Sequence, residues 1–108
     1  MGIFKNWKLK KQENKLIEDN KKLMALVKET ELIMNMTDDL EIKDAVNLVR
    51  DEIEYNKLSN TSDAKKLEVE ITHKLQDLKL LVNSKKKEKA ITLTKEIIRL
   101  LKQRNIVA

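Results

Sequence analysis

The chain has 108 residues and a net charge of +5, with no cysteine, no proline and a single glycine at position 2. This length suits one domain with a modest hydrophobic core. Because there is no cysteine, disulfides, cysteine-ligated zinc and thiol catalysis are excluded, and a reducing cytoplasm is the expected location. Because there is no internal glycine, phosphate-binding loops such as GxGxxG are excluded as well. We therefore expect no enzyme, no cofactor and no small-molecule substrate.

Residues 3–36 predict one long helix, because they lack proline and glycine and are rich in Lys, Leu, Glu and Met. Leu9, Leu16 and Leu23 occupy the d positions of a heptad pattern, and Glu13, Asn20 and Val27 occupy the a positions. Leucine at d with one asparagine at a favours a parallel two-stranded coiled coil, although the charged Glu13 departs from that pattern. We predict a homodimer. Its self-association residues are Leu9, Leu16, Asn20, Leu23 and Val27.

This first helix is too long for its companions to cover. At about 1.5 Å per residue it spans roughly 50 Å, against roughly 30 Å for each later helix. From Leu23 onward apolar residues surround most of the helix, so its C-terminal half is expected to enter a bundle. The N-terminal half then either projects from the bundle or pairs with a second copy. The alternative is that Leu9 and Leu16 pack on the last helix of the same chain.

Residues 1–11 combine Ile3, Phe4 and Trp7 with four lysines. On a helix, Phe4, Trp7 and Lys11 share one face. A basic segment with an aromatic anchor suits a membrane interface or an acidic groove on a partner. We favour a structural role instead, in which Trp7 caps the bundle or the end frays, and keep membrane-surface binding through Phe4 and Trp7 as a minor hypothesis. No apolar run is long enough to span a membrane.

Residues 38–58 predict the second helix. Asp38 and Glu41 have the spacing of a capping box at its start. The predicted core positions are Ile42, Ala45, Val46, Val49 and Ile53.

Two apolar residues of this helix, Leu48 and Tyr55, lie well off its core stripe and among acidic residues. We expect them to be buried under the long first helix. The alternative is an exposed strip with an acidic rim, which would bind a basic amphipathic helix of a partner. The residues of this partner-binding strip are Leu48, Asp51, Glu52 and Tyr55.

Residues 59–62 (Ser-Asn-Thr-Ser) form the clearest turn and imply an antiparallel hairpin with a third helix over residues 62–82. A weaker break at Asn83 and Ser84 precedes a fourth helix over residues 85–104, and the sequence leaves open whether these two helices are continuous. The predicted core positions of the third helix are Leu67, Ile71, Leu75, Leu78 and Val82. Those of the fourth are Ala90, Ile91, Leu93, Ile97, Ile98 and Leu101.

Few residues could carry chemistry. Glu70 and His73 have the Glu-x-x-His spacing of di-iron helical bundles, but both positions point away from the apolar stripe, so a solvated pair is expected. The acidic residues near position 40 lack the glycine and the spacing of a calcium loop. With one histidine, and serines only in turns and caps, no nucleophilic triad is available. We expect no catalytic, cofactor-binding or metal-binding residues.

Charge is distributed unevenly. Residues 37–60 carry seven acidic and three basic residues, a net −4, whereas residues 84–108 carry eight basic and two acidic residues, a net +6. The residues that could contact phosphates or an acidic protein partner are Lys85, Lys86, Lys87, Lys89, Lys95, Arg99 and Lys102. Such a stripe suits non-specific nucleic-acid contact, but it contains no aromatic residue for base stacking. We favour an ordinary solvated face of mixed charge, and keep contact with nucleic acid or with an acidic protein partner as the alternatives.

Together these patterns predict a single all-α domain, a bundle of about four helices with a long N-terminal helix that is a candidate for coiled-coil dimerisation. We expect a non-enzymatic protein–protein interaction or assembly module that self-associates. The Lys, Asn and Ile richness suggests a bacterial or phage source. The alternative function is a small nucleic-acid-binding regulator that uses the basic C-terminal helix. Periodicity and composition do not identify the partner protein.

Overall fold

The computed structural model describes the backbone of residues 3–108 and the side chains of residues 17–108. Over residues 3–108 the chain forms four α-helices and no strand, which confirms the predicted all-α helical bundle. The helices are α1 (Ile3–Asn35), α2 (Leu40–Tyr55), α3 (Ser62–Asn83) and α4 (Lys87–Val107).

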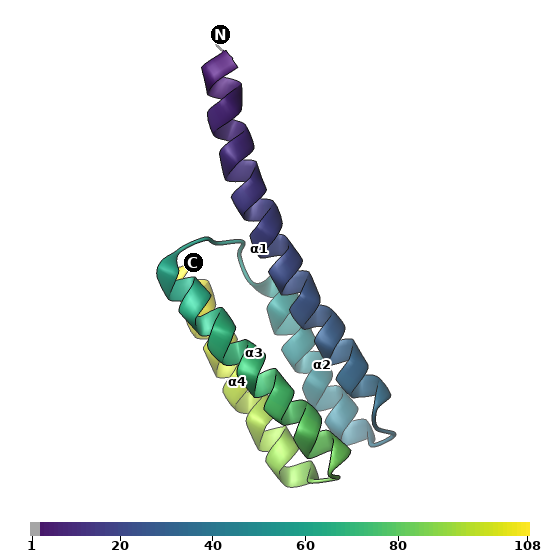
Figure 1. Ribbon diagram of the computed structural model, residues 1–108. Helices are drawn as coiled ribbons and strands as arrows, with labels where there is room; N and C mark the ends of the chain where they lie inside the picture. Colours follow the sequence, from purple (N-terminus) through teal and green to yellow (C-terminus); the bar gives the residue numbers. More distant parts are fainter. Residues whose placement is uncertain (1–2) are drawn as a thin grey trace.

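The helices form two antiparallel hairpins that lie side by side, α1 with α2 and α3 with α4 (Figure 1). Helix α2 packs on both α1 and α4, and α3 packs on α4, with a smaller contact between α1 and α3. The core therefore lies between the two hairpins.

Side chains next to the helices set where α2 and α3 begin. Asp39 is the N-cap of α2, because its Oδ1 atom accepts hydrogen bonds from the amides of Glu41 and Ile42, at 2.9 and 3.2 Å. The predicted capping box starting at Asp38 is therefore wrong by one residue. The hydroxyl of Thr37 accepts a hydrogen bond from the Asp39 amide at 3.1 Å. This bond holds Asp39 in the extended conformation that an N-cap needs. Thr61 caps α3 in the same way.

The turn between α3 and α4 is a Schellman motif built without glycine. The Lys86 amide donates to the Leu81 carbonyl at 2.9 Å, and the Lys85 amide donates to the Val82 carbonyl at 3.1 Å. Lys85 has a φ of 58°, in the left-handed region where a side chain with a Cβ is strained. These bonds stop α3 at Asn83, so α3 and α4 are separate helices.

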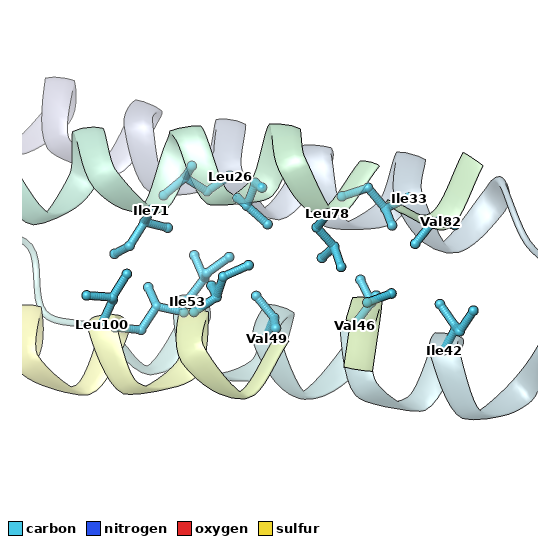
Figure 2. Close-up of a cluster of buried hydrophobic side chains, with 14 of the residues drawn as sticks. Leu26, Ile33, Ile42, Val46, Val49, Ile53, Ile71, Leu78, Val82 and Leu100 are labelled. Atoms are coloured by element: carbon cyan, nitrogen blue, oxygen red, sulfur yellow. The ribbon is translucent and has the colours of Figure 1, made fainter. Parts of the chain in front are cut away.

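Apolar side chains from all four helices form one continuous core, part of which Figure 2 shows. Its members are Leu23, Leu26, Ile33, Ile42, Val46, Val49, Ile53, Ile71, Leu75, Leu78, Val82, Ala90, Ile97, Leu100 and Leu101. The helical periodicity of α2, α3 and α4 identifies most of these positions correctly. Leu100 was not predicted, whereas Leu67, Leu93 and Ile98 are only partly buried at the edge of the core.

The prediction that Leu48 and Tyr55 are buried under the first helix is wrong. Leu48 is 59% exposed and Tyr55 is 83% exposed. The reason is geometric, because α1 and α4 both pack on the side of α2 that carries Val46 and Val49. Within residues 3–108, no helix packs against the opposite side of α2.

Helix α1 continues past the ends of the other three helices (Figure 1). The level at which it leaves the bundle is marked by Asp19, which accepts a hydrogen bond from the Ser59 amide in the α2–α3 loop. We call residues 3–18 the N-terminal arm. At about 1.5 Å per residue, its backbone extends roughly 24 Å beyond that level. Leu9 and Leu16 are the two predicted self-association residues that belong to the arm. Their side chains lie outside the described part of the structure.

Candidate functional site

The end of the bundle from which the arm projects is held by one buried arginine. Arg104, in the last turn of α4, has no exposed side-chain surface. Its Nη2 atom donates to both carboxylate oxygens of Asp19 in α1, at 3.0 and 2.9 Å. It also donates through Nε and Nη2 to Oε1 of Glu68 in α3, at 3.1 and 2.8 Å. One guanidinium thus joins three helices.

The remaining donors of Arg104 hold the α2–α3 loop. Its Nη1 atom donates to the backbone carbonyl of Lys57 at 2.7 Å and to Oδ1 of Asn56 at 3.3 Å. The five N–H groups of a guanidinium therefore face five acceptor atoms, and none is left to bind a ligand. The loop is fixed from the other side by the bond between the Ser59 amide and Asp19.

Asp19 and Glu68 share the Arg104 guanidinium, and the pKa values of the two carboxyls shift in opposite directions. Burial acts to raise the pKa of Asp19, but the neighbouring Glu68 carboxyl, the Ser59 amide and the Arg104 guanidinium together bring it below the ordinary value. Burial, followed by the neighbouring Asp19 carboxyl, raises the pKa of Glu68 despite the contact with Arg104. This is the behaviour of two like charges in one site, where ionisation of one opposes ionisation of the other.

A recess of about 140 Å³ opens beside this cluster. Its lining residues are Glu18, Asp19, Lys22, Ser59, Asn60 and Lys65. Asp19 and Ser59 are the buried residues of this lining, and the Asp19 carboxylate already accepts hydrogen bonds from Arg104 and from the Ser59 amide. We interpret the ionic cluster as a structural lock that fixes where α1 leaves the bundle.

Sequence reasoning missed this cluster. On the sequence alone, Arg104 was counted only in the net charge of residues 84–108, yet this residue follows Ile97 and Leu101 at helical spacing and so lies on the buried stripe of α4. Glu68 likewise precedes Ile71 by three residues, and Asp19 precedes Leu23 by four. A charged residue on an apolar stripe indicates a buried charge, and this signal was present in the sequence. The pairing of Arg104 with Glu68 and Asp19 depends on tertiary structure.

The predicted self-association residues that the structure describes have different environments. Leu23 is buried in the core, Val27 packs against that core, and Asn20 is exposed. All three line a groove of about 300 Å³ between α1 and α2, whose other lining residues are Met24, Ile53, Glu54, Asn56 and Leu58. Of the predicted self-association residues, Leu23 and Val27 therefore pack within the bundle, whereas Leu9 and Leu16 belong to the arm and Asn20 is exposed.

The predicted partner-binding strip forms part of a longer exposed face. Helical spacing places Leu40, Asp44, Leu48, Asp51 and Tyr55 on one side of α2, and all five are exposed. We call these residues the outer face of α2. Glu52 borders it and is half-buried.

The predicted basic residues divide into two groups. Lys87 is held by the carboxylates that flank the start of α2, with its Nζ atom 3.1 Å from Asp39 and 3.2 Å from Glu41. Its charge therefore contributes to the bundle's own stability. The exposed members are Lys85, Lys86, Lys89, Lys95, Arg99 and Lys102. Among these, Arg99 makes a long ion pair with Glu96 at 3.9 Å.

Glu70 and His73 are both exposed on α3. Among the described side chains, no group of three or more His, Cys, Asp or Glu residues is gathered as a metal site requires. Within the same part of the chain, no helix has both the length and the hydropathy to cross a bilayer. Phe4 and Trp7, named for membrane-surface binding, have side chains outside the described residues.

Comparison with known proteins gives no relative: no family model, curated protein or solved structure matches this chain. The fold and its surfaces define a four-helix bundle with a projecting helical arm.

Proposed function

We propose that this protein is a non-enzymatic assembly module that self-associates through α1. The observation that carries the proposal is that α1 continues past the ends of the other three helices (Figure 1). At about 1.5 Å per residue, the arm adds roughly 24 Å beyond the level of Asp19. Most helical stability in proteins comes from tertiary packing of an amphipathic face. A long helix that leaves its own bundle gains that packing when a second chain lies alongside it.

The sequence of the arm supports a helical partner. Leu9 and Leu16 continue the seven-residue spacing that ends at Leu23, and Asn20 occupies the a position between them and the bundle. Leu23 itself belongs to the chain's own core, so the contact between copies is centred on the arm. Leucine at d with asparagine at a is suited to a two-stranded contact.

Light scattering over a concentration series tests the proposal, with the variant Leu16→Glu beside the wild type. Asn14→Glu, which adds the same charge about 160° around the helix from Leu16, is the matched control. Pairing of two arms along Leu9 and Leu16 predicts a wild-type dimer, an unchanged Asn14→Glu dimer and a folded Leu16→Glu monomer. A Leu16→Glu variant that stays dimeric would keep self-association through the arm but place the contact on another side of it. A wild type that remains monomeric at all concentrations would overturn the proposal.

The second candidate is nucleic-acid binding by the outer side of α4. It is supported by Lys95, Arg99 and Lys102, which are exposed on the side of α4 away from the core. Neutralising phosphates with such a stripe releases counterions, so binding falls as salt rises. The test is salt-dependent binding of a generic DNA duplex. Replacing these three residues by Glu should abolish it, whereas the control variant, with Glu at the exposed positions Lys21, Lys28 and Lys66, should retain most of it.

A further inference from the structure

The outer face of α2 alternates apolar and acidic residues along its whole length. Leu40, Leu48 and Tyr55 are 74%, 59% and 83% exposed, and Asp44 and Asp51 lie between them, also exposed. With about 1.5 Å per residue, the face is roughly 22 Å long. A row of large exposed apolar side chains with a charged rim is typical of a site that binds another helix.

The charge of this face is uncompensated within the described part of the bundle. Asp44, Asp51 and Glu52 take part in no ion pair there, although other acids of the chain do. The basic residues of α2 lie on other sides of the helix. Arg50, for example, contacts Glu31 of α1 and Glu54, each at 3.4 Å. The face therefore selects a partner with positive charge and apolar side chains.

The N-terminal arm has the complementary composition. Residues 3–18 contain five lysines and two glutamates, a net +3, and the chain's only Phe and Trp. At about 100° per residue, one side of the arm carries two aromatic positions followed by basic ones. These positions are Phe4, Trp7, Lys8, Lys11 and Lys15. The arm and the outer face of α2 also have nearly the same length.

The arm cannot reach α2 of its own chain. Helix α1 is continuous from Ile3 to Asn35, with neither glycine nor proline inside it to allow a sharp bend. It also leaves the bundle pointing away from α2, with its exit fixed by Asp19 and Arg104 (Figure 1). A complementary arm must therefore come from another molecule.

We propose that the arm of one copy binds the outer face of α2 of a second copy, with Lys8, Lys11 and Lys15 facing Asp44 and Asp51. This inference rests on the proposed self-association and names the surface that the arm meets. Reciprocal exchange of two arms gives a closed dimer, as isologous contacts do. This contact between the arm and α2 differs from the pairing of two arms along Leu9 and Leu16. Those two leucines lie on another side of α1 from Lys8, Lys11 and Lys15.

Charge-reversal variants of the 108-residue chain test the proposal. One variant carries Lys8→Glu, Lys11→Glu and Lys15→Glu, and the other carries Asp44→Lys and Asp51→Lys. The control carries Asp63→Lys and Asp77→Lys, which are exposed positions on α3. Light scattering at low salt measures self-association, and circular dichroism confirms that each variant is folded.

We expect each charge variant alone to self-associate at least tenfold more weakly than the wild type, since its arm and face carry the same charge. An equimolar mixture of the two should recover dimers, because every arm then finds a face of opposite charge. The control should match the wild type.

Two results would overturn the inference. Either both charge variants dimerise as the wild type does, or their mixture fails to recover dimers. If Leu16→Glu still gives a monomer in those cases, the proposed function stands and the arms pair with each other instead. A wild type that is monomeric throughout removes both the proposed function and this inference.

Discussion

The Arg104 guanidinium donates to both oxygens of Asp19 across 85 positions of sequence, at 3.0 and 2.9 Å. These residues belong to α4 and α1, which are otherwise joined mainly through α2. The contact is fully buried, with 0% of the Arg104 side chain and 4% of the Asp19 side chain exposed. It fixes the direction in which α1 leaves the bundle, and so the direction of the arm.

Replacing Arg104 by Met should destabilise the fold strongly. The substitution leaves Asp19 and Glu68 buried without a cation, and breaking a buried ion pair in this way costs about 3–5 kcal/mol. Urea unfolding followed by circular dichroism measures the free energy of unfolding. Arg99→Met is the control, because its side chain is 72% exposed and the expected change is within about 0.5 kcal/mol. Equal effects at the two positions would show that Arg104 is not buried.

The two carboxyls of the cluster should give stability opposite dependences on pH. The pKa of Glu68 is raised, chiefly by burial, so above the ordinary glutamate value of about 4.3 the folded chain keeps a proton that the unfolded chain has released. Stability therefore falls as pH rises through that window. The pKa of Asp19 is lowered, so its contribution is present above the ordinary aspartate value and is lost as pH falls through the folded value.

Glu68→Gln should isolate the first of these effects. The variant removes the titrating group, so its stability relative to the wild type should improve as the pH rises above the ordinary glutamate pKa of about 4.3. Urea titrations at several pH values measure this difference, with the exposed Glu70→Gln as control. A relative stability that worsens with rising pH would mean that Arg104 holds Glu68 ionised and that its pKa is lowered.

Lys85→Gly should stabilise the protein. Lys85 has a φ of 58°, where a residue with a Cβ is less stable than glycine by about 1–2 kcal/mol. The gain is reduced by the greater freedom of glycine in the unfolded chain, so about 1 kcal/mol is expected. Thermal unfolding measures it. Lys86→Gly is the matched control, because Lys86 has a φ of −94° and should gain nothing from glycine. A destabilising Lys85→Gly would contradict the Schellman geometry.

Leu48→Ser and Tyr55→Ser should leave stability nearly unchanged. Both side chains lie on the outer face of α2, and surface substitutions usually change the free energy of unfolding by no more than about 0.5 kcal/mol. Ile53→Ala, on the opposite side of the same helix and 1% exposed, should cost about 2–5 kcal/mol. Measurements are made at a concentration where the protein is monomeric. A large loss from Tyr55→Ser would mean that this side chain is buried within its own chain.

Helical periodicity was enough to predict the elements and most of the core. The 4-3-4 spacing of Ile42, Val46, Val49 and Ile53 defines one side of α2, and all four residues are buried. Turn chemistry at residues 59–62 and the break after Asn83 separate the helices. These features depend on neighbours within a few residues, so they can be read from the sequence alone.

Only the tertiary structure decided which sides of the helices are covered. Periodicity places Leu48 and Tyr55 on one side of α2, but their exposure depends on α1 and α4 packing against the other side. In the same way, the sequence around Arg104 does not show its ion pairs. Its partners Asp19 and Glu68 lie 85 and 36 residues away and reach it only in the folded chain. Local spacing determines which residues share a face, whereas burial and charge pairing depend on which distant segment packs against that face.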